Sequence, residues 1–137
     1  MTPRKRKALK KAFQENEDSA DVFFPKKSDF NYWFTFINSV MFDNCLDKPT
    51  RVEIRRLHGR LGEAECDVNT GETCIRLKDR FYAASRADLD ASSKQMFINT
   101  LAHEMVHLLE MQMIGKMTHG RFYKGWKKTF DRIGIVL

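Results

Sequence analysis

Two histidines and a glutamate are spaced so that they could hold a metal ion and activate water beside it. They form the HExxH segment His103-Glu104-Met105-Val106-His107. The segment lies inside a predicted helix, where positions four apart lie one turn apart on the same face. Both imidazoles can therefore reach one Zn²⁺ ion, which binds neutral imidazole nitrogen. Glu104 projects beside that face, where it can accept a proton from an attacking water molecule.

A third protein ligand must come from elsewhere, because a catalytic zinc site takes three and leaves one position to water. A histidine six residues after the pair would complete one known arrangement, but that position holds Met113. A glutamate on a later helix would complete another, and no glutamate follows Glu110. His119 comes after a tight loop at the start of the last helix, so it can fold back over the ion. We therefore favour His119 over Asp131, about three turns further along, and over His58, near the first strand.

Two predicted helices position these residues. The first runs over about residues 94–114; Ser92 or Ser93 can cap its start, and Gly115 suits its C-terminal cap. A short loop turns the chain into a last helix over about residues 120–132. Apolar residues recur on that helix at helical spacing, which predicts one buried side. These residues are Phe122, Tyr123, Trp126, Phe130 and Ile133.

The remaining elements predict a fold of the α+β class, in which a core helix packs with a small sheet. Ser28 or Asp29 can cap the core helix, which continues to about Phe42. Residues 50–77 alternate apolar and charged side chains and read as three strands. Residues 78–91 read as a polar connection. The apolar stripe of the core helix consists of Phe30, Trp33, Phe34, Ile37, Val40 and Met41.

A hairpin is predicted around Gly71, which suits the left-handed position of its turn. The register that puts all apolar residues of both strands on one face pairs Cys66 with Ile75, and we expect that shared face to decide the pairing. Cys66 then points to the core and Cys74 away from it, so we predict no disulfide between them. The five apolar residues are Ala64, Cys66, Val68, Ile75 and Leu77.

The bulk composition indicates a single globular domain with an excess of positive charge. The 137 residues fit one domain, and the net charge of +6 suits either an anionic partner, such as nucleic acid, or a merely basic protein. Three cysteines indicate a reducing compartment, so we expect an intracellular location, in the cytoplasm or in a eukaryotic nucleus. No apolar run is long enough for a membrane span, and we expect no membrane partner.

Residues 1–27 read as a basic leader ahead of a domain over residues 28–137. The first eleven residues carry six basic side chains and no acidic one. They could contact nucleic acid, or form the solvated start of a helix that continues to about Phe13, and we predict the helix. The leader is not a secretory signal, because no apolar stretch follows its charges.

The predicted last helix carries a cationic face next to His119. This face could hold DNA phosphates, or an acidic substrate, beside the metal site. It could equally be a solvated face whose charges suit a helix C-terminus. Nothing in the pattern indicates base-specific readout, so any nucleic-acid contact is expected to be sequence-tolerant and salt-dependent. The candidate contacts are Arg121, Lys124, Lys127 and Lys128.

Two segments around the histidines match the pattern of a known family. The first is Thr100–His107, TLAHEMVH, and the second runs from His119 to Tyr123, HGRFY, with Trp126 after it. Together they resemble the SprT-like metallopeptidase domain, a family that includes the Spartan proteases, which degrade proteins crosslinked to DNA. The resemblance extends, less specifically, over about residues 30–135. Tyr123 takes an aromatic position where Phe is more usual in the family.

The resemblance implies a zincin-like core and the activity of a zinc-dependent endopeptidase. The substrates that it suggests are DNA-associated or DNA-crosslinked proteins. It assigns His103, His107 and His119 as zinc ligands and Glu104 as the base. Tyr123 is a candidate oxyanion or substrate contact. Many family members carry a cysteine-rich zinc ribbon after this core, and none is expected here. The alternative is a non-catalytic module, stabilised by zinc, that binds nucleic acid or protein; the intact base argues against it, because a structural site needs none.

Overall fold

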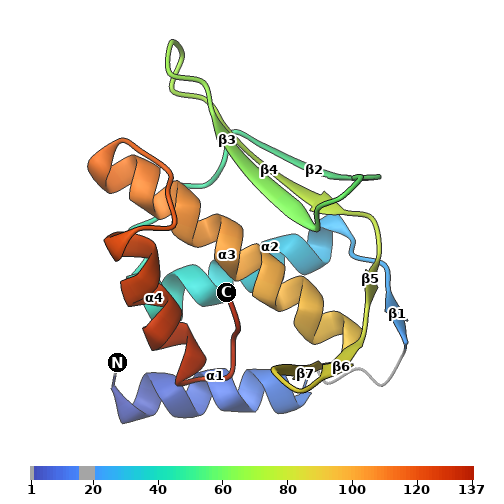
Figure 1. Ribbon diagram of the computed structural model, residues 1–137. Coiled ribbons are helices and arrows are strands. Elements are labelled where there is room, and N and C mark those ends of the chain that lie inside the picture. The colour runs from blue at the N-terminus through green and yellow to red at the C-terminus, as the bar shows by residue number, and fades with distance from the viewer. Residues whose placement is uncertain (1, 16–20) are drawn as a thin grey trace.

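The computed structural model describes residues 2–15 and 21–137, which form four helices and seven short strands (Figure 1). The helices are α1 (Pro3–Glu15), α2 (Lys27–Phe42), α3 (Ser93–Ile114) and α4 (Arg121–Asp131). The strands are β1 (Val22–Phe23), β2 (Arg51–Arg55), β3 (Gly62–Cys66), β4 (Thr73–Lys78), β5 (Phe81–Tyr82), β6 (Ala84–Arg86) and β7 (Leu89–Ala91). The predicted α+β class is confirmed, while the predicted domain boundary between residues 27 and 28 stays a prediction.

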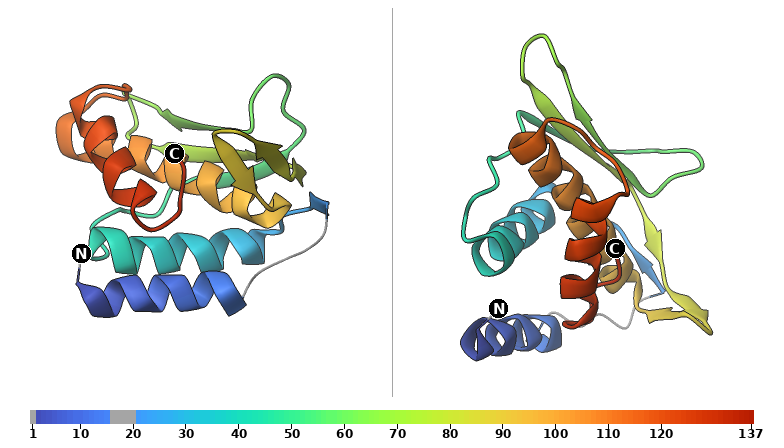
Figure 2. Two further views of the ribbon diagram at one scale, coloured as in Figure 1. Left: turned by 60° about the horizontal axis from the view of Figure 1, so that its bottom comes forward. Right: turned by 60° about the vertical axis from the view of Figure 1, so that its left-hand side comes forward.

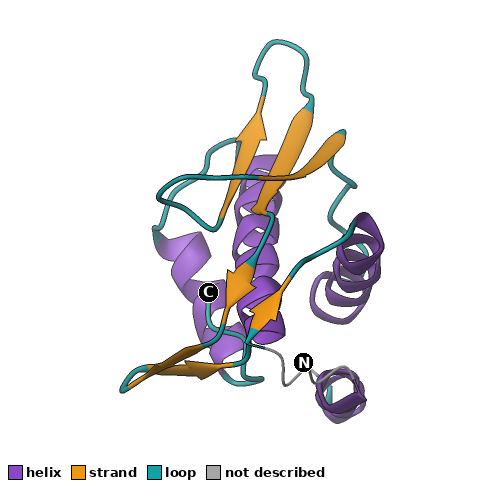
Figure 3. Cartoon of the chain, turned by 90° about the vertical axis from the view of Figure 1, so that its right-hand side faces the viewer, coloured by secondary structure: helices purple, strands orange, loops and turns teal. Residues whose placement is uncertain are grey.

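Helix α3 is the central element, and most of its sides are buried. It contacts α2, α4 and strands of all three small sheets. Figures 1 and 3 show the sheets along one side of α3, with α2 and α4 against other sides. A surface helix buries only one apolar stripe, so α3 owes its stability to these neighbours. Its fully buried apolar residues include Phe97, Leu101, Ala102, Met105 and Val106.

The ends of α3 follow local signals. Ser92 Oγ accepts a hydrogen bond from Gln95 N–H at 3.1 Å, which satisfies one of the free amide groups of the first turn. Gly115 ends the helix in the left-handed conformation, at φ 75°, which glycine adopts readily because it has no Cβ. The predicted range 94–114 is confirmed to within one residue.

Helix α2 begins before both residues predicted to cap it. Its first helical residue is Lys27, and Asp29 lies in the first turn. The Asp29 carboxylate accepts a hydrogen bond from Lys26 N–H at 2.8 Å, so it closes the helix start from inside rather than from the capping position. The predicted apolar stripe is confirmed by its largest members. Those buried are Phe30, Trp33, Phe34 and Ile37.

Strands β2, β4 and β3 form a three-stranded sheet in that order (Figure 3). β2 runs parallel to β4, whereas β3 runs antiparallel to it and lies against α3. Gly62 allows this close approach because it has no side chain. A Cβ at this position would lie 2.8 Å from Thr100 Cγ2. Since Thr100 lies one turn before His103 on α3, this contact places the start of β3 beside the HExxH segment.

The β3–β4 hairpin has the predicted faces but not the predicted register. Ala64, rather than Cys66, pairs with Ile75. A shift of two residues keeps every side chain on its face, since side chains alternate with period two. Asp67 Oδ1 accepts hydrogen bonds from two amides of the turn, at 2.9 and 3.3 Å, so the turn begins early. Val68 therefore leaves the strand and is 84% exposed.

The three cysteines are free thiols, and two of them lie on opposite faces of the sheet. Cys74 lies on the outer face, as predicted, but it is buried rather than exposed. Ion pairs cover it: Arg76 binds Glu53 at 2.6 Å, and Cys74 Sγ lies 3.8 Å from Glu53 Oε2. Burial raises the pKa of the Cys74 thiol, which keeps it protonated and unreactive.

Residues 78–91, predicted as a polar connection, contain three short strands. β5 pairs with β1, and β6 pairs with β7. Phe81 in β5 is fully buried, and its ring centroid lies 5.7 Å from that of Phe97 in α3. The prediction of a polar connection without strands is therefore wrong. Its cause is that strands of two or three residues show too little periodicity to be recognised in a sequence.

Helix α1 covers 13 residues of the basic leader and packs beside α2 (Figure 2). Leu9 and Ala12 are buried, and Lys5 forms an ion pair with Asp43, just after α2. The predicted helix is confirmed, but it is docked on the body of the molecule rather than merely solvated. Among the helices described, none combines the length and apolar character that a membrane crossing requires.

Candidate metal centre

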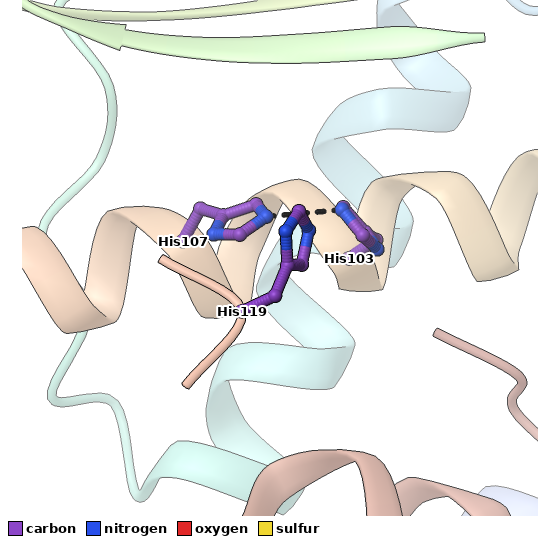
Figure 4. Close-up of side chains that lie close together, drawn as sticks. All are labelled: His103, His107 and His119. Carbon is purple, nitrogen blue, oxygen red and sulfur yellow. Dashed lines mark hydrogen bonds between the residues drawn. The ribbon is translucent and has the colours of Figure 1, made fainter. Parts of the chain in front are cut away.

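Three histidine side chains converge on one point beside α3 (Figure 4). His103 and His107 project from successive turns of α3, and His119 reaches them from the loop before α4. Nε2 of His103 lies 3.0 Å from Nε2 of His107. One ring nitrogen of each histidine lies within 4.8 Å of the others. The structure thus brings together all three histidines that the sequence analysis selected.

The cluster has the chemistry and the size of a tetrahedral metal site. Metal–nitrogen bonds of about 2.0–2.1 Å at tetrahedral angles place ligand nitrogens about 3.3 Å apart, close to the separation of the His103 and His107 nitrogens. The pKa of His103 is lowered to about 4, first by burial and then by the charge of His107. Burial also lowers the pKa of His107. Both rings are therefore neutral near pH 7, which is the form that binds a divalent ion.

Aromatic packing holds α4, and with it His119, against the rest of the molecule. Trp126 of α4 meets Phe42 of α2 edge to face, with ring centroids 4.8 Å apart. Phe130 is fully buried, and the ring of Tyr123 contacts the rings of all three histidines. The predicted helix over 120–132 is observed as Arg121–Asp131, with its apolar side inward.

Glu104 is a buried carboxyl group beside the histidines. It is 5% exposed, and its Oε1 lies 3.9 Å from Nε2 of His103. The pKa of Glu104 is raised to about 7, chiefly by burial and secondly by the charge of Glu63 on β3. A cation held by the histidines would lower it again, because an opposite charge favours the carboxylate. A carboxyl group that titrates near neutrality suits proton transfer at pH 7.

The two other candidates for a third ligand lie apart from this cluster. Asp131 ends α4, where its carboxylate pairs with Lys127 at 3.6 Å. His58 is exposed in the connection between β2 and β3. Within residues 2–15 and 21–137, the group of side chains able to hold a metal ion consists of His103, His107 and His119.

A model of the SprT-like family matches residues 30–135. The match spans most of the 137 residues and includes all three histidines and Glu104. The chain belongs to the SprT-like family. No curated protein and no solved structure matches it. The resemblance seen in the sequence is thereby confirmed.

Tyr123 of this SprT-like chain is placed to orient two of the histidines. Its hydroxyl lies 3.3 Å from Nδ1 of His103, and its ring stacks on His107 with an interplanar angle of 11°. Burial raises the pKa of Tyr123, so the hydroxyl stays protonated. With Nε2 of His103 facing the cluster, its Nδ1–H can donate to the hydroxyl oxygen, just as a metal-bound histidine usually donates its other ring N–H to an outer partner. The predicted oxyanion or substrate contact stays a prediction.

Replacing Tyr123 with phenylalanine separates these two roles. If the hydroxyl orients His103, its loss should weaken zinc binding about tenfold, since outer partners of metal ligands contribute roughly ten- to a hundredfold. If it donates to an oxyanion, zinc affinity should be unchanged and kcat should fall. We expect the weaker zinc binding, measured by competition with a chromogenic chelator. Unchanged affinity in Tyr123→Phe would contradict the orienting role.

A groove of about 320 Å³ opens beside Glu104 in the SprT-like chain. Apolar side chains from different elements line it, including Leu61, Leu89 and Met96. The sequence analysis missed this groove, because part of its wall comes from strands that were predicted as a polar connection. A larger cavity, of about 520 Å³, lies near the β3–β4 turn and is lined by none of the three histidines.

The predicted nucleic-acid contacts lie on α4, the helix that follows His119. Arg121, Lys124 and Lys128 are exposed, whereas Lys127 is half-buried and pairs with Asp131. The charge of Lys127 also contributes to the lowered pKa of His103, so this cation lies near the cluster. The other three side chains are available to a partner, and nucleic-acid binding stays a prediction.

Sequence reasoning also missed Glu110, a second buried carboxyl group on α3. It lies three residues after His107, on the same side of the helix, and is 1% exposed. The signal was present in that spacing, but the sequence could not show what the carboxylate contacts. In the structure it contacts the loop that carries His119.

Proposed function

We propose that this chain is a zinc-dependent endopeptidase of the SprT-like type. The observation that carries the proposal is the three-histidine cluster with the buried carboxyl group of Glu104 beside it. The SprT-like family is associated with zinc metallopeptidases, which supports the same reading. A structural zinc site fills all four positions with protein ligands. Among the described residues, no fourth histidine, cysteine or carboxylate joins the group. One coordination position is therefore left for water, as catalysis requires.

Each side chain then has a task in hydrolysis. His103, His107 and His119 hold Zn²⁺, which supplies Lewis acidity toward a peptide carbonyl and lowers the pKa of water. Glu104 takes the proton of the attacking water and returns it to the nitrogen of the leaving amine. The groove beside Glu104 holds the polypeptide so that the reacting atoms meet in one orientation.

The proposal extends to the surroundings of the site. The central helix with an antiparallel strand at its side is consistent with a zincin-like core. The exposed cations of α4 and the net charge of +6 support protein substrates that are bound or crosslinked to DNA, inside the cell. DNA contacts of this kind go to phosphates, so they are independent of base sequence and weaken as salt rises.

Zinc content and proteolysis test this function together. Purified protein should carry about one zinc ion per chain and cleave a basic protein substrate, and a chelator should abolish cleavage until zinc is restored. Single-stranded DNA should raise the rate at about 50 mM salt and lose its effect near 200 mM. Protein that takes up no zinc would overturn the proposal. Zinc binding without cleavage, with or without DNA, would favour the non-catalytic binding module instead.

A further inference from the structure

The buried carboxyl group of Glu110 joins the metal-binding helix to the loop that carries His119. One carboxylate oxygen accepts a hydrogen bond from Thr118 N–H, and the other accepts one from Thr118 Oγ1 at 3.2 Å. Burying a carboxylate is unfavourable unless its oxygens are hydrogen-bonded, and here both are. We refer to this contact as the Glu110–Thr118 clamp.

The clamp holds the backbone on both sides of His119. Thr118 Oγ1, which donates to Glu110, also accepts a hydrogen bond from Gly120 N–H at 3.1 Å. One hydroxyl can make both bonds, because it has one proton and two lone pairs. Gly120 in turn starts α4, since its carbonyl oxygen accepts from Lys124 N–H at 2.9 Å. Residues 118 and 120 are thus tied to α3 and to α4.

His119 needs such support more than the other two histidines do. His103 and His107 are carried by a buried helix, whereas His119 is exposed on a loop. Among the described residues, no hydrogen bond to the His119 ring is observed. The ring packs edge to face against Tyr123, so its position depends on that contact and on its backbone. The apparent affinity of a site falls in proportion to the fraction of molecules that hold the binding conformation.

We propose that Glu110 is a positioning residue of the metal site, whose clamp on Thr118 keeps His119 in the conformation that binds the ion. The inference rests on the proposed function, in which His119 is a zinc ligand. Glu110 touches no reacting group and acts only through the loop.

Glutamine at position 110 separates this clamp from a simple effect of charge. The carboxylate lies close enough for its charge to act on His107. The side-chain oxygen of a glutamine can still accept from Thr118 N–H, and its NH₂ group can donate to Thr118 Oγ1. The hydroxyl has a second lone pair for this bond, and because Thr118 is exposed, its own proton can turn to solvent. Glu110→Gln therefore keeps the clamp and removes the charge, whereas Glu110→Ala removes both.

The experiment measures zinc affinity by chelator competition and the melting temperature of the zinc-free protein. Glu110→Ala should bind zinc at least about tenfold more weakly, within the range known for supporting residues of metal sites. Glu110→Gln should stay within about threefold of wild type. Thr118→Val, an exposed substitution that keeps the backbone amide, should fall between them. The double variant Glu110→Ala, Thr118→Val should be no weaker than Glu110→Ala, because both act through one contact.

Gln112 provides a matched control on the same helix. Its side chain ties a different loop to α3, donating to Cys45 O at 2.7 Å and accepting from Asp47 N–H at 2.9 Å. Gln112→Ala should lower the melting temperature of the zinc-free protein and leave zinc affinity unchanged. If Gln112→Ala and Glu110→Ala lost zinc affinity equally, the loss would be caused by general destabilisation of the protein, and the inference would be overturned.

Two further outcomes decide against the clamp. A glutamine variant as weak as the alanine variant would assign the effect to charge. Normal zinc affinity in folded Glu110→Ala would remove the positioning role. If that variant does not fold, normal zinc affinity in Thr118→Val would do the same. In both cases zinc binding and cleavage by the wild type would leave the proposed function standing. Wild-type protein that binds no zinc would instead overturn the proposed function itself.

Discussion

Glu104→Gln is expected to abolish peptide hydrolysis while leaving zinc bound. Glutamine keeps the size and shape of the side chain, but its amide cannot accept the proton of an attacking water. General-base catalysis contributes roughly a hundred- to ten-thousandfold, so we expect kcat to fall by about a thousandfold or more. The three histidines are untouched, so zinc content should stay at the wild-type level. Both quantities can be measured on one preparation, kcat with a basic protein substrate and zinc by elemental analysis.

The same substitution has a second readout in the zinc-free protein. The pKa of Glu104 is raised from 4.5 to about 7 in the folded chain. Between these values the folded protein holds a proton that the unfolded chain has released, so this group contributes stability that is lost as pH rises through 7. Glutamine does not titrate. Zinc-free Glu104→Gln should therefore gain stability relative to wild type by on the order of 3 kcal/mol between pH 4 and pH 8, measured by denaturant unfolding at each pH.

Glu63→Gln is the control for losing a carboxylate near the site. Glu63 lies on β3 and pairs with Arg60 at 2.5 Å. Its charge raises the pKa of Glu104, but its own carboxylate accepts no proton in the proposed step. Its variant should keep zinc and hydrolysis. A Glu104→Gln protein that cleaves at the wild-type rate would contradict the base assignment, and one that loses zinc along with activity would make Glu104 a support of the metal site.

His119→Ala is expected to weaken zinc binding by more than about a hundredfold, because even the outer partners of metal ligands contribute roughly ten- to a hundredfold. Hydrolysis should disappear with the metal. The side chain is exposed, so its loss should change the stability of the zinc-free protein by no more than about 0.5 kcal/mol. Zinc raises the melting temperature of a protein that binds it when folded, and this rise should be lost in the variant. Chelator competition and thermal unfolding with and without zinc measure the two effects.

Two alanine substitutions serve as controls for His119. His58→Ala makes the same change at an exposed position outside the cluster and should leave zinc binding at the wild-type level. Asp131→Ala removes the rival ligand, which pairs with Lys127 in the structure, and should also have no effect. If His119→Ala bound zinc with wild-type affinity and Asp131→Ala bound it weakly, the third zinc ligand would be Asp131 rather than His119.

Local signals were enough to place two histidines and Glu104 on one helix. The HExxH spacing matches the helical repeat, and Ser92 and Gly115 mark both ends of α3. Such features depend on neighbours within a few residues, so a sequence displays them directly. The apolar stripe of α2 is readable for the same reason. The family resemblance also follows from these segments, and the match over residues 30–135 confirms it.

Contacts between distant segments decided the rest. The hairpin register depended on side-chain bonds within its turn, and β5 on the burial of Phe81 against α3. Only packing of α4 against α2 shows that His119, and not Asp131, reaches the other histidines. The raised pKa of Glu104 and the role inferred for Glu110 likewise depend on burial. The sequence by itself determined which chemistry this chain could perform, because residue type and helical spacing are local. Only the tertiary structure decided which side chains meet, because burial and hydrogen bonding arise when remote segments pack together.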